Sequence, residues 1–168
     1  KKNKTIDFDL LKKASKKIFV PLTVGGGISS FNDAKNAFHS GADKVSINSS
    51  FLDNNSFIKD VVNDFGSQSV VLSADVKITN NSEYYVYINS GNIKKISLVK
   101  WIKKAENFSV GELLINSIES DGIKNGYDTS LYKKITELEY PINPGTKVTY
   151  SGLKMWVGSS KTHYFLDF

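Results

Sequence analysis

The sequence predicts an α/β protein with a parallel sheet, because short apolar runs that end in glycine or polar residues alternate with amphipathic segments of helical spacing. Strands that alternate with helices in this way imply βαβ units, whose functional residues gather at the carboxyl ends of the strands. The pattern alone does not distinguish an open sheet from a barrel. The predicted elements are a helix over 5–18, a strand over 19–24, a helix over 32–39, a strand over 44–48, a helix over 56–65, a strand over 69–76, a hairpin over 83–89, a helix over 101–107, a strand over 112–116 and a helix over 130–138.

The first helix and strand are defined by apolar spacing and by glycines. From Thr5 to Ile18, apolar residues recur at helical spacing with lysines between them. The run Phe19–Val24 is predicted to be a buried strand because it is short, apolar and followed by three glycines. Ser29 or Ser30 is expected to cap the next helix.

The strand–helix unit then repeats. Gly41 and Gly66 follow the next two helical segments, as glycines at helix ends do. The segment over 83–89 interrupts the repeat because tyrosines and aliphatic residues alternate in it, and Gly91 follows. This segment therefore predicts a small hairpin inserted after the strand over 69–76.

The carboxyl-terminal part departs from the pattern. Pro141, Pro144 and Gly145 interrupt it, and the tail over 147–168 shows no clear strand–glycine–helix repeat.

Length and composition exclude several classes of protein. A complete eightfold barrel usually needs about 250 residues, and this chain has 168. The absence of cysteine excludes disulfides and thiolate metal sites, and the separated His39 and His163 offer no metal-ligand spacing, so we expect no metal or cofactor. The net charge of +5 comes from lysines spread along the chain, which favours solvated helix faces over nucleic-acid binding. No apolar run approaches the length of a membrane span, so we expect a soluble, cytoplasmic protein.

Three glycine-containing turns are candidate anion sites. The glycines at 25–27 follow a strand and precede a helix, where backbone amides can hold an anion, although a tight turn alone would also use glycine. Asn48 and Ser49 end the next strand and can face the same anion from the neighbouring loop. Asp121 and Gly122 follow the strand over 112–116 and form the third candidate, whose alternative is another ordinary turn.

Asp75 is the best candidate for a catalytic residue. It lies at the end of an apolar strand, and a carboxylate held on such a rigid element can transfer protons. The alternative is that Asp75 pairs with Lys77 or caps a loop. Lys44 and Glu112 begin two strands, so we expect them to form a charge pair at the opposite edge, where stability is the default role.

Four segments together resemble a known family: FVPLTVGGGISS, GADKVSINSS, FGSQSVVLSADVK and GELLINSIESDGIKNGYD. They are similar to the cyclase subunit of imidazole glycerol phosphate synthase (the HisF family), over roughly residues 5–141. The resemblance implies part of a phosphate-binding (β/α)8 TIM-type barrel of the ribulose-phosphate class. It implies a barrel unit over 1–143 without the first two strands, and a divergent tail over 144–168.

The resemblance also implies an enzyme activity. In the family, ammonia from a glutaminase subunit attacks a bisphosphorylated ribulosyl substrate, and the products are imidazole glycerol phosphate and an aminoimidazole carboxamide ribotide. A heterodimer with the glutaminase would follow, with no nucleic acid, membrane or cofactor. The implied roles are catalysis for Asp75, binding of one phosphate for Gly27, Asn48 and Ser49, binding of the other for Gly122, support of the active site for Asp121, the ammonia gate for Lys44 and Glu112, and the glutaminase interface for Asp43.

Three departures from the family pattern bear on activity. The family's other catalytic aspartate lies on a first strand that these residues do not include, and the paired glycines expected after Tyr140 are replaced by YPINPGTKVTYSGLKMW. Ile123 replaces a threonine that is common in the family. Two alternatives therefore stay open. One is a HisF-like subunit that amidates sugars for surface polysaccharides, and the other is an inactive fragment that only binds phosphate.

Overall fold

The computed structural model describes residues 6–88, 91–120, 128–136, 147–151, 155–157 and 163–165. Nine strands form one sheet in the described part of the chain. The helices are α1 Phe8–Ser15, α2 Phe31–His39, α3 Ser49–Asp53, α4 Ser56–Phe65, α5 Leu98–Glu106 and α6 Thr129–Thr136, with a 3-10 turn at Ser67–Ser69. The strands are β1 Thr23–Gly25, β2 Lys44–Ile47, β3 Val70–Ile78, β4 Tyr84–Ile88, β5 Ile93–Ser97, β6 Glu112–Ser117, β7 Lys147–Ser151, β8 Met155–Val157 and β9 His163–Phe165.

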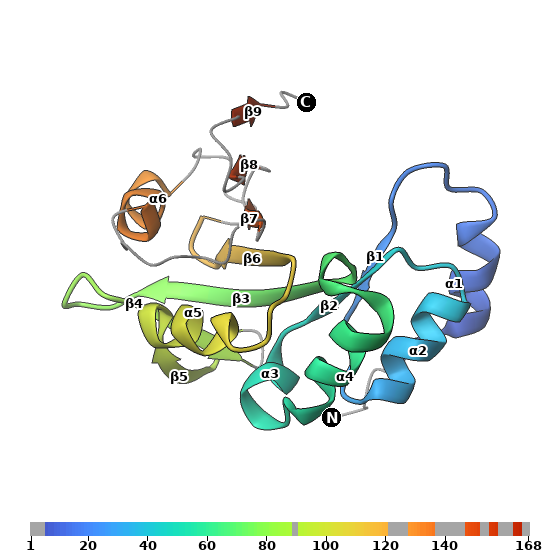
Figure 1. Ribbon diagram of the computed structural model, residues 1–168. Coiled ribbons are helices and arrows are strands. Elements are labelled where there is room, and N and C mark those ends of the chain that lie inside the picture. The colour runs from blue at the N-terminus through green and yellow to red at the C-terminus, as the bar shows by residue number, and fades with distance from the viewer. Residues whose placement is uncertain are drawn as a thin grey trace.

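The sheet is built around five parallel strands in the order β1-β2-β3-β6-β7. Figure 1 shows α3, α4 and α5 gathered on one side of the long strand β3. The sheet does not close on itself, since β1 ends the strand order on one side. The predicted α/β class with an incomplete barrel is confirmed.

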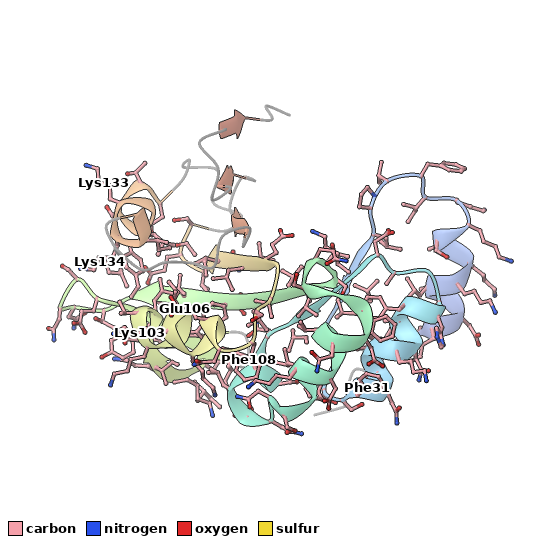
Figure 2. All side chains as sticks on the ribbon, in the orientation of Figure 1. Phe31, Lys103, Glu106, Phe108, Lys133 and Lys134 are labelled. Atoms are coloured by element: carbon pink, nitrogen blue, oxygen red, sulfur yellow. The ribbon has the colours of Figure 1, made fainter. Side chains whose placement is uncertain are left out.

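The core lies between the parallel strands and the helices. Its largest fully buried side chains include Trp101 of α5 and Phe51 of α3, whose rings meet edge to face at 5.4 Å. Phe108 meets Phe51 in the same way at 5.4 Å, and Phe31 lies 6.2 Å from Phe65. Figure 2 shows Phe31 and Phe108 among the helices on this side of the sheet. Edge-to-face pairs of this kind add to the stabilisation that burial provides.

The predicted hairpin is present and extends the sheet sideways. Strand β4 pairs antiparallel with β3 and with β5. The hairpin strands β4 and β5 lie outside the parallel order. Its side chains alternate, so that Tyr84, Val86 and Ile88 are buried while Tyr85 and Tyr87 are half-buried on the other face. The period of two that predicted the hairpin therefore separates a helix-facing side from an open side.

The first predicted strand is wrong at its beginning. The strand starts at Thr23, and Phe19 and Val20 are 96% and 68% exposed instead of buried. Pairing begins only where the carbonyl of Leu22 accepts from the amides of Asp43 and Lys44. The segment before Pro21 has no strand beside it in the described part of the chain, so its apolar side chains have nothing to pack against.

The sequence also missed two features. The short helix α3 directly follows β2, where a loop was expected. Strand β7 continues the parallel order beside β6, and β8 and β9 follow it antiparallel, within a tail in which no repeat was recognised. The boundary of the tail at residue 144 stays a prediction. No helix in the described residues has the length and apolar character needed to cross a membrane.

Leucines at two sites allow a matched test of the core. Leu72 is fully buried in the central strand β3, whereas Leu10 on α1 is 63% exposed. We expect Leu72→Ala to lower the free energy of unfolding by about 2–5 kcal/mol, because it removes buried contacts and leaves a cavity. Leu10→Ala should cost less than about 1 kcal/mol. Urea unfolding followed by circular dichroism measures both, and equal losses would contradict this placement of the core.

Candidate functional site

The carboxyl ends of three adjacent strands bring one carboxylate and two amides together. Asp75 on β3 lies opposite Asn116 on β6 in the strand register, and Asn48 follows β2 on the other side. The side-chain amide of Asn48 donates to Asp75 Oδ2 at 3.0 Å, and that of Asn116 donates to Asp75 Oδ1 at 3.0 Å. Each oxygen of the carboxylate thus accepts one hydrogen bond, which fixes its plane and leaves further lone pairs available for a proton.

Asp75 does not pair with Lys77, which was one alternative to a catalytic role. The ion pairs Lys44–Glu112 and Lys95–Asp53 involve neither of these two residues. The ammonium of Lys77 instead lies 5.6 Å from the centre of the Tyr87 ring. The carboxyl group of Asp75 is therefore held by the neutral amides of Asn48 and Asn116.

The glycine loop after β1 lies beside the end of β2. A Cβ atom on Gly25 would come within 2.9 Å of Ser46 Cβ, so only glycine allows the two strands to approach this closely. Gly26 and Gly27 follow with φ of 86° and 114°, in the region that favours glycine. The hydroxyl of Ser50 donates to the carbonyl of Ile28 at 2.8 Å and ties this loop to α3. The two loops predicted to share an anion are thus neighbours.

Helix α2, which follows the glycine loop, is capped by its own side chains. The hydroxyl of Ser30 accepts from the amide of Asp33 at 3.2 Å, and Asp33 Oδ2 accepts from the amide and the hydroxyl of Ser29, each at 3.0 Å. Ser30 was one of the two predicted caps. Because the carboxylate of Asp33 already occupies this end of the helix, an anion in the loop would depend on the amides of Gly26 and Gly27.

Hydrogen bonding lowers the pKa of the Asp33 carboxyl group. Partial burial raises the pKa of this carboxyl, but the hydrogen bonds from Ser29 and Ser30 outweigh burial and hold the pKa below its ordinary value.

The predicted charge pair lies at the opposite edge of the sheet. Lys44 Nζ is 2.6 Å from Glu112 Oε2, where β2 and β6 begin. The carboxylate is nearly buried, since Glu112 is 6% exposed. Next to this pair, Asp43 Oδ2 accepts from the amide of Leu22 at 2.7 Å, which joins the beginnings of β1 and β2. The geometry expected for Lys44 and Glu112 is confirmed, while the roles in ammonia passage and partner binding stay predictions.

A second carboxylate connects the hairpin to α6. The hydroxyl of Tyr84 donates to both oxygens of Asp128, at 2.9 and 3.1 Å, and the hydroxyl of Ser117 donates to Asp128 Oδ2 at 3.2 Å. Asp128 also accepts from the amide of Leu131 and so caps α6. Burial, together with the hydrogen bond and the charge of Asp128, raises the pKa of Tyr84 above its ordinary value. The predicted site residues Asp121 and Gly122 lie outside the described residues.

Sequence reasoning missed Asn116 as a partner of Asp75. The residue was used only as the end of a strand, although it stands at a strand end just as Asn48 does. The available signal was this shared position, but only the register of β3 with β6 shows that the two amides flank the same carboxylate. The described residues contain no group of three or more histidine, cysteine, aspartate or glutamate side chains that could hold a metal ion.

Fold and site together define an incomplete parallel α/β barrel with a carboxylate at the carboxyl ends of its strands and a charge pair at their beginnings. The family model described as histidine biosynthesis protein matches residues 1–152. The chain therefore belongs to this family, whose members are (β/α)8 barrels.

Similar proteins carry the name that the sequence motifs indicated. The imidazole glycerol phosphate synthase subunit HisF of Alkaliphilus metalliredigens (strain QYMF) is 45% identical over 130 residues, which are 77% of this chain and 52% of that protein. The subunit HisF of Endomicrobium trichonymphae is 43% identical over 76% of this chain and 50% of its own length. The subunit HisF of Bacillus cereus (strain Q1) is 42% identical over 80% of this chain and 53% of its own length. The resemblance to HisF is confirmed, and the chain spans about half the length of these relatives.

The energetic role of the buried charge pair can be measured with a double-mutant cycle. We expect Lys44→Met, Glu112→Leu and the double variant to give a coupling energy of about 1–3 kcal/mol, because the carboxylate is shielded from water. The exposed pair Lys95–Asp53, with its atoms 3.3 Å apart, is the matched control and should give about 0–0.5 kcal/mol. Urea unfolding of both sets provides the values. Equal coupling in the two pairs would show that Glu112 is as solvated as Asp53.

The capping carboxylate predicts a dependence of stability on pH. Because the pKa of Asp33 is lower in the folded state, its contribution is present above the unfolded pKa and is lost as the pH falls through the folded pKa. Asp33→Asn should therefore lower the melting temperature near pH 7, and the difference from the parent should shrink toward about pH 2. The exposed Asp60→Asn on α4 is the control. A difference for Asp33→Asn that stays constant with pH would contradict the cap.

Proposed function

We propose that this chain carries part of the catalytic unit of an ammonia-dependent cyclase, the synthase subunit that forms imidazole glycerol phosphate in histidine biosynthesis. The observation that supports this most directly is the orientation of Asp75 by two amides at the carboxyl ends of the parallel strands, the edge where barrel enzymes hold their active sites. The similarity to HisF subunits supplies the reaction class. We place the reaction in the cytoplasm.

In this proposal Asp75 transfers protons during ring closure. The carboxylate can accept a proton from the nitrogen that attacks the ribulosyl carbonyl. It can then return the proton to an oxygen that leaves as water. The amides of Asn48 and Asn116 keep the carboxylate facing the open side of the sheet through both steps.

The two phosphates of the substrate are assigned to two loops. Gly26 and Gly27 have left-handed backbone angles, and their loop is tied to the start of α3 at Asn48 and Ser49, so backbone amides from both segments can serve one phosphate. Since the side chain of Asn48 donates to Asp75, we assign the backbone of Asn48 and Ser49 to the phosphate. Gly122 is assigned to the second phosphate and Asp121 to a supporting role, both on the family resemblance.

Ammonia is proposed to enter at the opposite edge, from a glutaminase partner. Lys44 and Glu112 meet there across the beginnings of β2 and β6 and would form the gate, and Asp43 would lie at the interface. Because the pair joins two side chains, it can separate without breaking the backbone hydrogen bonds of the strands that carry them.

Complementation tests the proposal with the whole chain. A histidine auxotroph that lacks the cyclase subunit would express the parent, Asp75→Asn, or Asp64→Asn, an exposed carboxylate on α4. We expect growth with the parent and with Asp64→Asn, and a cyclase rate about 100- to 10,000-fold lower for Asp75→Asn. Equal activity of all three would overturn the role of Asp75.

The second candidate is a phosphate-binding fragment without cyclase activity. It is favoured by the sequence after Tyr140, where YPINPGTKVTYSGLKMW replaces the paired glycines expected on the family resemblance. Absence of growth, combined with saturable phosphate-dependent shifts of the Gly26, Gly27 and Ser49 amide signals in NMR spectra, would support this candidate over the cyclase.

A further inference from the structure

Lys77 is a half-buried lysine for which the proposed mechanism gives no role. It lies two residues beyond Asp75 on β3, and alternate residues of a strand point to the same face. Two residues along a strand span about 6.6 Å, so the side chains of Asp75 and Lys77 lie close together on that face. The ion pairs Lys44–Glu112 and Lys95–Asp53, however, include neither of them.

Neutral groups define the position of the Lys77 ammonium. It lies 5.6 Å from the centre of the Tyr87 ring. A Cβ atom built on Gly91 would be 3.5 Å from Lys77 Nζ, 3.3 Å from Lys77 Cε and 3.1 Å from Ile118 Cδ1. The ammonium is therefore held between the hairpin and the residue that follows β6. A cation placed against an aromatic face and an apolar side chain keeps most of its capacity to bind an anion.

A hollow lies on the hairpin, next to the strand segment that carries Lys77. Its volume is about 460 Å³, and its lining includes Tyr85, Tyr87, Lys94 and the acidic Glu83. Tyr85 lies opposite Lys77 in the register, and Tyr87 lies opposite Asp75. The ammonium of Lys94 sits 3.4 Å from the centre of the Tyr85 ring. The face beyond Asp75 thus combines two ammonium groups and two tyrosine rings with one carboxylate, that of Glu83, and the hollow is large enough for a small phosphorylated molecule.

We propose that Lys77 adds a charged contact to one of the two phosphates of the ligand that Asp75 acts on, and that the tyrosine-lined hollow receives the adjoining part of that ligand. The proposal deepens the proposed function and rests on it. Lys77 supplies the positive charge that Asp75 lacks among its own contacts, so the ligand connects the two charges. A purely structural lysine in this position would pair with a carboxylate or extend into water.

Inorganic phosphate serves as the probe, with NMR spectra of the ¹⁵N-labelled full chain as the readout. Phosphate is titrated at constant ionic strength against sodium chloride. Lys77→Met keeps the apolar stem but removes the charge, and Lys77→Arg keeps the charge. Lys59→Met is the matched control, because Lys59 lies at the same 5.6 Å from an aromatic ring, that of Phe108, but is exposed on α4.

We expect phosphate to shift the amide signals of Lys77, Gly91 and Ile118 saturably in the parent, in Lys77→Arg and in Lys59→Met. Lys77→Met should bind at this place at least about tenfold more weakly. Unchanged signals elsewhere in the spectrum, and an unchanged urea midpoint, show that the variant is folded.

Three results would overturn the proposal. They are equal affinity in Lys77→Met, shifts of the same size with chloride, and no saturable shift of these three signals in the parent. If phosphate shifts only Gly26, Gly27 and Ser49 in every variant, the Lys77 site fails while the phosphate loop of the proposed function stands. If Lys77 responds but Asp75→Asn does not reduce cyclase activity, the cyclase proposal fails and the anion site remains.

Discussion

The parallel register of β2, β3 and β6 is the constraint on which both functional edges depend. Val45 pairs with Val70 and Leu72 with Leu113, so the three strands begin and end at nearly the same level. Parallel strands place all their carboxyl ends at one edge. The same alignment therefore puts Asp75 between two amides at one edge and Lys44 against Glu112 at the other. A shift of one residue would turn these side chains to the opposite face of the sheet.

The two edges handle charge in different ways. At the beginning of the strands, Glu112 is nearly buried and a lysine compensates its charge directly. At the carboxyl ends, Asp75 accepts hydrogen bonds from two side-chain amides, while Lys77 on the same strand lies near an aromatic ring. A compensated pair contributes to stability, whereas separated charges remain available to a ligand that carries complementary groups. This difference agrees with a stabilising role for the Lys44–Glu112 edge and a catalytic role for the Asp75 edge.

The hairpin connects the site to the rest of the fold. Its buried face packs toward α5, and its open face carries the tyrosines beside Lys77 and Lys94. Tyr84 on the buried face also reaches Asp128, which caps α6. The hydroxyl group thereby joins the hairpin that follows β3 to α6, which follows β6 in the chain. Such a buried hydrogen-bonded carboxylate restricts the relative movement of the elements that it connects.

The sequence by itself determined the alternation of strands and helices, the hairpin, the glycine turns and the candidates Asp75, Lys44 and Glu112, because period, glycine position and strand-end polarity are local properties. It placed the first strand too early, since whether Phe19 is buried depends on a neighbouring strand and not on its own apolarity. Only the tertiary structure decided that Asn116 holds Asp75, that Lys77 turns to Tyr87 and that β7 joins the parallel order. These are contacts between residues far apart in the chain, and they are fixed by register and packing, which a sequence pattern does not record.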